Sequence, residues 1–584
     1  MNEILSRYLP RIDFDSYEDF FKNYICNVPD NFNFAYDVAD EWALIDKEKK
    51  ALLWTDDSHE VKSFTFAEIK RLSDKAANAL VSLGVKKGDV VKLILKQRPG
   101  VWVIMCALSK IGAVCIPGTY QLTAKDLEYR CNTADVKLLI TVDDEDVLEN
   151  IRVSRPNCPR LEKVAVIGDT IPQGCINMRD EIQKAPEHFT RVPTLTTDPM
   201  LIYFSSGTTG FPKMVIHNHS LPLGHIVTAK FWHCAEDNGV HLTQTDSGWA
   251  KFAWGKIYGQ WICGAAIGAY DTVKFTPKGM LDAIRILRPS TFCATATIFR
   301  YLIKEDLSGC DFSFIRRASV AGEPLSPEVY NKFKELTGLE IREGFGQSET
   351  SVMAAVFKWL TVKPGSMGKP APLFSLKLLD ENGAECDEGI VGNMSVTSAG
   401  KNMYETGSAI KETYSETNKD ALCEYKPPVI GASDFPGLFR GYWKDREVTV
   451  KNWNNGVYRT GDMAWRDDDG YLWFVGRNDD VIKCSGYRIG PFEVESALME
   501  HPSVLECAVT AAPDAMRGQI VKATVVLARG FKAGDELIRE LQNHVKRVTA
   551  PYKYPRIIVF VSELPKTISG KIKRMEIRKQ DFDK

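Results

Sequence analysis

Apolar and polar positions follow a regular order along the first part of the chain. Thr65 is followed three residues later by Glu68, a capping-box pattern that predicts a helix running to about Leu83. Short, mainly apolar segments then recur between helical patterns, and we interpret them as buried strands. They are VVKLIL from Val90, GAVCIP from Gly112 and VKLLITV from Val136. Apolar strands that alternate with helices predict an α/β fold, with parallel sheets covered by helices on both faces.

The pattern changes scale near the C-terminal end. A short helix, two strands, a helix and a strand are expected at Phe492–Glu500, Val504–Ala511, Ile520–Leu527, Asp535–Val548 and Arg556–Val561. We therefore predict a large N-terminal domain of parallel or mixed sheets over residues 1–478 and a small α+β domain over residues 479–584. The segment Ala399–Phe435 is polar, rich in turn residues and without clear periodicity. It is expected to be a long surface insertion.

Composition narrows the class of protein. The chain has 584 residues, of which 44% are hydrophobic and 26% charged, with a net charge of −2. These values are ordinary for a soluble globular protein and give no indication of a nucleic-acid or membrane-surface partner. The longest apolar stretch, Val101–Pro117, is interrupted by Ser109 and Lys110. It predicts a buried helix followed by a strand, so no integral membrane contact is expected.

The cysteines and the first residues indicate the compartment. The 14 cysteines are scattered and form no CxxC pair. This is typical of reduced thiols, and neither disulfides nor zinc ligands are predicted. The first residues mix charges throughout and lack the apolar segment of a signal peptide. We expect a cytoplasmic protein.

The stretch YFSSGTTGFPKM, Tyr203 to Met214, carries the first chemical signal. Glycines, hydroxyl residues and a lysine follow directly after an apolar run. Lys213 is separated from Gly210 by two residues and is followed by Met214, so the stretch is not a Walker A loop. Backbone N–H groups at glycines, hydroxyl donors and an ammonium group are nevertheless suited to phosphate oxygens. The stretch is predicted to be a phosphate loop of another kind.

The phosphate loop resembles that of the adenylate-forming superfamily, which contains acyl-CoA synthetases, luciferases and adenylation domains of peptide synthetases. Five further motifs of that superfamily follow in the same order. They are AGEP (Ala321–Pro324), EGFGQSET (Glu343–Thr350), YRTGDMA (Tyr458–Ala464), GRNDDVIKCSGYRIGPFEVE (Gly476–Glu495) and PKTISGKIKR (Pro565–Arg574). The resemblance covers nearly the whole chain and is closest to prokaryotic medium-chain acyl-CoA synthetases.

The resemblance implies a reaction in two halves. A carboxylic acid attacks the α-phosphate of ATP and releases pyrophosphate, and the thiol of coenzyme A then displaces AMP from the acyl-adenylate. ATP, Mg²⁺ and coenzyme A as co-substrate are therefore expected. A carboxylate is already ionised at neutral pH, so this chemistry requires positioning and neutralisation of charge and no general base.

The motifs assign catalytic roles by resemblance. Glu349 is the magnesium ligand, Ser348 contacts the α-phosphate, and Lys571 bridges the acyl carboxylate and the α-phosphate. The β- and γ-phosphates are expected to bind Ser205, Thr208, Thr209 and Lys213.

The same motifs assign the nucleoside site. Asp462 accepts hydrogen bonds from the ribose hydroxyls with support from Arg477, and Phe345 stacks on the adenine. The rest of the adenine pocket is expected from Gly322, Glu323 and Pro324.

The resemblance also implies that the small domain rotates between the two half-reactions. Asp479 matches the hinge position. Lys571 serves adenylation, whereas Gly486 leaves room for the pantetheine arm of coenzyme A in the second half-reaction. Arg488 is expected to meet phosphates in one of the two states, and Arg517 is a weaker candidate for the nucleotide end of coenzyme A.

Three residues are candidates for the acyl pocket. Gly346 occupies a position where acetyl-CoA synthetases, by resemblance, carry a tryptophan that closes the pocket. Trp254, in DSGWAKFAWGKIYGQW, is expected to occupy much of the space that the glycine opens, with Lys251 nearby. Together they favour a short, medium or branched acid. A core role for Trp254 is the alternative.

Several alternatives stay open at this stage. The enzyme could load a carrier protein in place of coenzyme A, or the chain could be a sensor of nucleotides or acyl-CoA without activity. His217 and His219 have the spacing of a strand and no accompanying ligands, so we interpret them as structural. The sequence is compatible with a homodimer and does not identify the acid.

Overall fold

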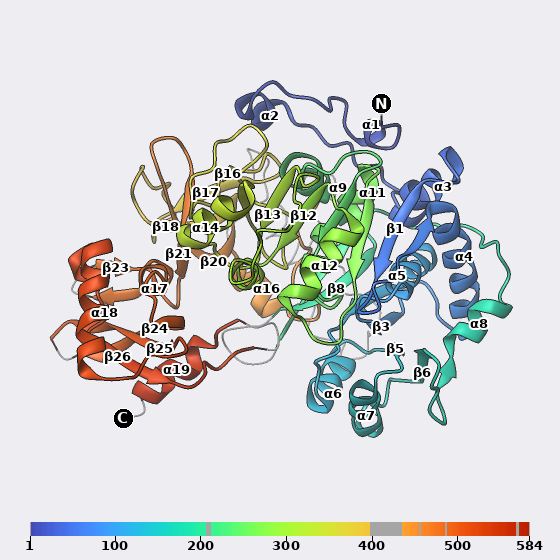
Figure 1. Cartoon of the computed structure of the whole chain (residues 1–584). Helices are drawn as coiled ribbons and strands as arrows, with labels where there is room; N and C mark the ends of the chain where they lie inside the picture. Colours follow the sequence, from blue (N-terminus) through green and yellow to red (C-terminus); the bar gives the residue numbers. More distant parts are fainter. Residues whose placement is uncertain are drawn as a thin grey trace, which may run out of the picture.

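The computed structural model describes residues 2–205, 212–397, 435–454, 457–484, 487–514, 516–567 and 571–582. Figure 1 shows a large part, coloured from blue to orange, and a smaller part at one side that contains the elements coloured red. The predicted positions Thr208, Thr209 and Gly486 lie outside the described residues. So does nearly all of the predicted insertion Ala399–Phe435.

A seven-stranded sheet contains the first group of predicted strands. Its order is β7 (Ile176–Asn177), β6 (Lys163–Ile167), β5 (Leu138–Val142), β3 (Val90–Ile94), β4 (Val114–Pro117), β8 (Pro199–Ser205) and β9 (Lys213–Asn218). All neighbours are parallel except β8 and β9, which are antiparallel. The three strands that the apolar segments predict are therefore confirmed, together with their parallel arrangement.

Helices cover both faces of this sheet. Val91 and Leu93 of β3 pack in the cluster that contains α4 (Phe66–Ser82) and α5 (Gly100–Ile111). Val90 and Ile94 pack on the other side with α6 (Ala124–Thr133) and α7 (Glu145–Ser154). Alternate residues of one strand are thus buried on opposite faces, which explains the continuous apolar pattern.

Local capping starts the helices where the sequence indicates. The Thr65 hydroxyl accepts from the Glu68 N–H at 3.2 Å, and the Glu68 carboxylate accepts from the Thr65 N–H at 2.8 Å. Thr123 and Asp126 form the same capping box at the start of α6. The helix, strand and turn pattern of this region therefore depends mainly on neighbouring residues.

A nine-stranded sheet forms the second layer of the large domain. Its order is β16 (Lys369–Pro370), β15 (Ala354–Ala355), β14 (Ile341–Phe345), β13 (Arg317–Val320), β12 (Thr291–Ala294), β10 (Val240–Thr243), β11 (Ala266–Tyr270), β1 (Lys50–Thr55) and β2 (Lys62–Thr65). Six neighbouring strands of this sheet are parallel, namely β14, β13, β12, β10, β11 and β1. The strands β2, β15 and β16 add antiparallel edges. One face packs against α12 (Pro277–Leu287), α13 (Ala296–Leu302) and α14 (Pro327–Thr337).

A five-stranded antiparallel sheet completes the large domain. It consists of β17 (Ser375–Leu379), β18 (Gly392–Thr397), β19 (Trp453–Asn454), β20 (Val457–Arg466) and β21 (Leu472–Arg477). The other elements of this domain are α1 (Leu5–Tyr8), α2 (Tyr17–Asn23), η1 (Ala35–Asp40), α3 (Glu41–Ile45), η2 (Arg155–Asn157), α8 (Met178–Lys184), α9 (Leu221–Ile226), η3 (Val227–His233), α10 (Lys251–Gly255), α11 (Tyr258–Ile262) and α16 (Arg446–Asn452).

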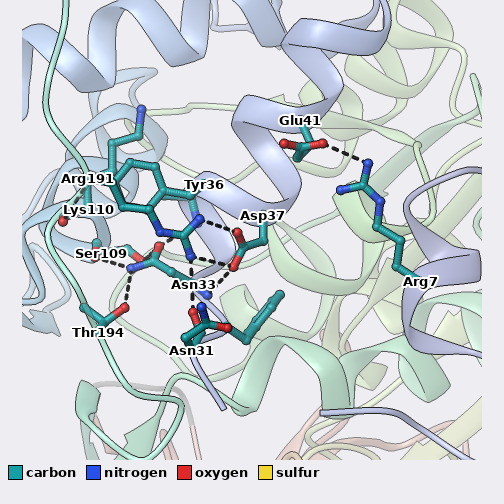
Figure 2. A network of polar contacts seen from close by, with 12 residues as sticks. Arg7, Asn31, Asn33, Tyr36, Asp37, Glu41, Ser109, Lys110, Arg191 and Thr194 are labelled. Atoms are coloured by element: carbon teal, nitrogen blue, oxygen red, sulfur yellow. Dashed lines mark hydrogen bonds and ion pairs between the residues drawn. The ribbon is translucent and has the colours of Figure 1, made fainter. Parts of the chain in front are cut away.

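Polar contacts attach the N-terminal segment to the first sheet layer (Figure 2). Arg191 donates to the carboxylate of Asp37 at 2.7 Å. The Asn33 amide donates to the Ser109 carbonyl at 2.7 Å and to the Thr194 hydroxyl at 3.1 Å. One exposed ion pair and two buried amide contacts thus hold the residues that precede β1 against the first sheet layer.

The small domain has its own sheet and core. The sheet contains β22 (Ile482–Cys484), β23 (Tyr487–Ile489), β24 (Val504–Asp514), β25 (Gly518–Leu527) and β26 (Ile557–Val561). It is accompanied by α17 (Pro491–Met499), α18 (Asp535–Val548), η4 (Pro551–Lys553) and α19 (Arg574–Phe582). Its buried apolar cluster runs from Ile482 to Ile558 without residues of the large domain. The predicted α+β elements are confirmed, whereas the boundary at residue 479 stays a prediction.

The apolar stretch Val101–Pro117 forms α5 and β4, as the sequence predicts. Among the described residues, no helix has both the length and the apolar character needed to cross a membrane.

Candidate active site

The predicted motifs meet where the strands of two sheets end. Ser205 at the end of β8 is paired with Lys213 at the start of β9. The segment after β14 lies beside β9, because His217 Nε2 is 2.7 Å from the carbonyl oxygen of Ser348. Residues 435–443 also contact the segment that follows β14, since the Phe439 N–H donates to the Glu349 carbonyl at 2.7 Å. Motifs far apart in the sequence thus share one place in the fold.

Glu349 is buried, with 9% of its surface exposed. The Tyr442 hydroxyl donates to its Oε1 at 3.0 Å, and the Lys213 ammonium lies 5.1 Å from the centre of the Tyr442 ring. Burial raises the pKa of Glu349, and the Tyr442 hydrogen bond and the charges of Arg477 and Lys213 oppose this rise. Burial also lowers the pKa of Lys213, which the Glu349 carboxylate opposes. The two predicted residues therefore act on each other electrostatically.

This carboxylate fits a magnesium ion that comes with a nucleotide. Mg²⁺ is usually bound through one or two carboxylates together with substrate phosphates and water. Glu349 offers one buried carboxylate beside the phosphate-loop strands. Within the described ranges, no group of three or more His, Cys, Asp or Glu could form a cage made of protein ligands alone.

Asp462 on β20 is held by a hydrogen-bond network. The Gln347 amide donates to Asp462 Oδ2 at 2.6 Å and to the Thr460 carbonyl at 2.9 Å. The Tyr458 hydroxyl donates to Gln347 Oε1 at 2.7 Å, and Arg477 Nη1 lies 3.4 Å from Asp462 Oδ1. Burial raises the pKa of Asp462, while the positive charges of Arg477 and Lys571 oppose it. Sequence reasoning missed Gln347, although it lies between Gly346 and Ser348 in a recognised motif.

The AGEP segment lies at the end of β13. Gly322 has φ of +95° and no atom within 4 Å of an added Cβ, so its backbone borders open space. The Glu323 side chain accepts from the N–H and the hydroxyl of Thr297, at 3.1 and 2.8 Å, so it is turned towards the start of α13. Phe345 is half-buried, and its ring centre lies 6.3 Å from that of Phe474.

Lys251 lies beneath the same segment. Its ammonium donates to the Ala321 carbonyl at 3.1 Å, and burial lowers the pKa of Lys251. The structure therefore places this predicted acyl-site residue next to the strand end that precedes Gly322.

Gly346 and Trp254 are in direct contact, as expected. A Cβ added at Gly346 would lie 2.3 Å from the indole Cη2 of Trp254 and 2.7 Å from the Ser351 carbonyl oxygen. Gly344, two residues earlier on the same face of the strand, leaves equivalent room for Trp232. The two indole rings are 6.1 Å apart with an interplanar angle of 88°. The space that Gly346 opens is thus filled by Trp254, which is 6% exposed.

The predicted residues of the small domain lie in two different surroundings. Lys571 is exposed, and its charge acts on Asp462. Arg488 instead forms an ion pair of 2.7 Å with Glu381, on the turn after β17. Lys571 thus acts electrostatically on a large-domain carboxylate, whereas Arg488 is held by an ion pair with a different part of that domain.

The predicted hinge residue is held by the last helix. Arg578 on α19 donates to the Asp479 carbonyl and forms an ion pair of 3.0 Å with Asp480. Arg477 Nε lies 3.9 Å from the Asp479 carboxylate. Sequence reasoning missed Arg578, because nothing local indicates that it reaches the hinge.

His217 and His219 are fully buried, and burial lowers the pKa of each to about 4. Both are therefore neutral at physiological pH. This agrees with the interpretation of both residues as structural, and His217 supports the backbone at Ser348.

Comparisons with known proteins bear on the family and the fold. The profile of the AMP-binding enzyme family matches residues 39–404, and that of the AMP-binding enzyme C-terminal domain matches residues 493–571. Acyl-coenzyme A synthetase ACSM3, mitochondrial, from Mus musculus is 38% identical over 579 residues, which cover 98% of this chain and 94% of that protein. Acyl-coenzyme A synthetase ACSM5, mitochondrial, from the same organism is 40% identical over 564 residues, covering 95% and 92%.

A solved structure extends the comparison to the fold. The anthranilate CoA ligase AuaEII, in complex with anthranoyl-AMP, aligns with a TM-score of 0.81 and 26% identity, over 95% of this chain and 98% of that chain. The expected adenylate-forming fold, with a large N-terminal and a small C-terminal domain, is thereby confirmed.

Proposed function

Because the chain belongs to the AMP-binding enzyme family and is an AMP-forming acyl-CoA synthetase, we propose that it activates a short- to medium-chain or branched carboxylic acid. The observation that carries this choice is the contact between Trp254 and Gly346. The buried indole limits the depth of the pocket that a glycine would otherwise open, which disfavours long fatty acids.

A panel of acids tests this proposal. Pyrophosphate release and thioester formation are measured for straight chains from acetate to octanoate, for isobutyrate and 2-methylbutyrate, and for palmitate and benzoate as contrasting acids. We expect the highest kcat/KM among the short, medium or branched acids. A maximum with palmitate or benzoate would contradict the proposed acid class. A phosphopantetheinylated carrier protein, supplied in place of coenzyme A, tests whether the acyl group is transferred to a carrier protein or to coenzyme A.

We assign the adenylation half-reaction to residues of both domains. The carboxylate oxygen attacks the α-phosphorus, the bond to the β-phosphate oxygen breaks, and pyrophosphate leaves with the bonding electrons. Ser348 and Lys571 are proposed to hold the α-phosphate, where charge reorganises most strongly. The β- and γ-phosphates are assigned to Ser205, Thr208, Thr209 and Lys213.

Glu349 is the proposed magnesium ligand. The ion, when bound with the nucleotide, neutralises phosphate charge and orients the leaving group. Burial keeps the Glu349 carboxylate in a low-dielectric place, where its attraction for a cation is strong. The Tyr442 hydroxyl is well placed to fix its orientation.

The nucleoside is assigned to the strand ends around Asp462. Its carboxylate is proposed to accept hydrogen bonds from the ribose hydroxyls, with Gln347 and Arg477 holding it in position. The adenine is assigned to the backbone of Gly322, Glu323 and Pro324 and to the ring of Phe345.

The thioester half-reaction requires the other face of the small domain. The thiol of coenzyme A gives up its proton to solvent and its sulfur attacks the acyl carbon. The bond from that carbon to the phosphate oxygen breaks, and AMP leaves with the bonding electrons. We assign the pantetheine path to Gly486 and phosphate contacts to Arg488, with Arg517 as a further candidate. Because Arg488 is paired with Glu381 here, this step needs a rotation, which we assign to the hinge at Asp479.

The compartment and assembly are also proposed. Every described cysteine is a free thiol, which a reducing compartment such as the cytoplasm maintains. The relatives named above are mitochondrial proteins. Cell fractionation decides between the two locations, and light scattering tests for a homodimer.

A further inference from the structure

A buried lysine stands in the middle of a strand that looks apolar in sequence. Lys92 lies in β3 between β4 and β5, with Ile116 and Leu139 as its register partners. Its exposed fraction is 0%. The ammonium nitrogen has no hydrogen-bond partner in the part of the chain that the structure describes. An aliphatic residue would suit this position better, because an unpaired buried charge is costly.

A second cation lies beside it. The guanidinium carbon of Arg130, on α6, is 4.7 Å from the centre of the Phe204 ring, and Lys92 Nζ is 5.9 Å from the same centre. Arg130 Nε is buried and has no hydrogen-bond partner among the described residues. Two cations therefore share one aromatic neighbour, and their repulsion adds to the cost of burying them.

Among the residues that the structure describes, no acid forms an ion pair with Lys92 or Arg130. The charged and titratable groups that act on Lys92 are Arg130, Asp126 and Cys131 on α6 and Cys115 on β4. The Asp126 carboxylate accepts from the N–H and hydroxyl of Thr123, at 3.1 and 2.6 Å, and so caps its own helix. Burial raises the pKa of both cysteines, which stay neutral thiols.

The pair lies where the phosphate loop begins and ends. Phe204 directly precedes Ser205, which is paired with Lys213. The Tyr129 hydroxyl, next to Arg130 on α6, donates to the Pro212 carbonyl at 3.2 Å. A Cβ added at Gly118 would lie 2.8 Å from Lys92 Nζ, so the long side chain reaches the carboxyl end of β4. Ligands of parallel sheets bind at this edge.

We propose that Lys92 and Arg130 are positioning residues that attract the diphosphate end of ATP, and the pyrophosphate leaving group, from the β3 and α6 side of Ser205 and Lys213. They act through space and through Phe204. The inference rests on the assignment of Tyr203–Met214 as the phosphate loop. It adds residues outside every motif that the family resemblance contains, and it explains why a buried strand carries a charge.

The charge on Lys92 makes the proposal testable by pH. Burial, followed by the nearby charge of Arg130, lowers the pKa of Lys92 to about 7. The lysine is charged below that pH and neutral above it. A bound anion favours the charged form, so binding raises this pKa and takes up a proton. The attraction is therefore greatest in acid and disappears as the pH rises above the pKa of the complex.

The experiment measures binding of magnesium pyrophosphate to the full-length protein by calorimetry at pH 6.0 and pH 8.5. We expect Lys92→Met to bind about tenfold more weakly than the native chain at pH 6.0, and nearly equally at pH 8.5. The matched control is Lys125→Met, which removes the same charge from an exposed position on α6. Its affinity is expected to equal that of the native chain at both pH values, because exposed charges are screened.

A second variant keeps the test decisive if Lys92→Met does not fold. Arg130→Met is expected to weaken pyrophosphate binding at both pH values, since arginine stays charged. Equal affinities of native chain and both variants at pH 6.0 overturn the inference while leaving the synthetase function intact. Failure of the native chain to bind pyrophosphate overturns the phosphate-loop assignment as well. A purely structural lysine would change the melting temperature but not the ratio of affinities between the two pH values.

Discussion

The two parts of the proposed site differ in burial and in the partners that hold them. On the large domain, Glu349 and Asp462 are buried at 9% and 5% exposure, and each accepts a hydrogen bond from a neighbouring side chain. On the small domain, Lys571 is exposed, and Arg488 makes an ion pair with a glutamate that is 71% exposed in its side chain.

This difference in burial is consistent with two half-reactions that use the same nucleotide site but different residues of the small domain. The residues proposed to hold the nucleotide have buried partners, which supports electrostatic preorganisation. The residues expected to act in only one step are bound by surface contacts that are individually weak. Arg578 contacts the backbone of Asp479, the proposed hinge residue, and the carboxylate of Asp480. Substitutions of the buried large-domain residues are therefore expected to be tolerated poorly. Substitutions of the exposed small-domain residues are expected to affect one half-reaction more than the other.

The largest effect is expected from Lys571→Ala. Removing the bridging charge should slow pyrophosphate release about 1,000-fold. Conversion of a supplied acyl-adenylate to acyl-CoA should stay within about threefold of the native rate, because the other face of the small domain serves that step. Lys573→Ala, two residues away, is the matched control and should leave both rates unchanged. An equal loss in both half-reactions would remove the distinction between the two faces.

A smaller effect is expected from Gln347→Ala on the buried half. Loss of the 2.6 Å hydrogen bond to Asp462 should raise the KM for ATP about tenfold, the value of one hydrogen bond to a charged group. The KM for the acid should change little. Gln183→Ala, at an exposed position on α8, serves as the control. An unchanged KM for ATP would mean that Asp462 does not need this support.

Gly346→Ala tests how rigid the buried half is. The new methyl group would meet Trp254 at 2.3 Å, so the indole must move. We expect a loss of about 1–3 kcal/mol in the free energy of unfolding and a several-fold change in preference among acids. Gly309→Ala is the control, since no atom lies within 4 Å of its added Cβ. An unchanged preference for acids would place the acyl pocket away from Trp254.

The smallest effect is expected from Glu381→Ala. This change releases Arg488 from a surface ion pair worth at most about 1 kcal/mol, so the thioester step should quicken by about fivefold or less. Glu385→Ala breaks a comparable pair with Lys377 in the same hairpin and should have no effect. A slower thioester step in Glu381→Ala would indicate that the ion pair assists the second half-reaction.

The elements of the fold were largely predictable, and the contacts of the site were only partly so. The capping residues Thr65 and Glu68 act within one helical turn, and α18 begins and ends at the predicted residues. Gln347 was not recognised as a partner of Asp462, because that contact depends on how β14 meets β20. Lys92 was counted within an apolar strand, and its local sequence does not show that its buried ammonium lies near Arg130 and Phe204.

The sequence by itself determined the order of helices and strands, the superfamily and the identity of most motif residues. The helices and strands depend on periodicity and capping, which act over a few neighbouring residues, whereas the superfamily and the motif residues follow from the resemblance of six ordered motifs. Only the tertiary structure decided that Trp254 fills the space at Gly346, that Arg488 is bound to Glu381, and that Lys92 and Arg130 lie near the same ring, Phe204. Such contacts join residues from different sheets and helices, so they follow from the order and packing of those elements and from no local pattern.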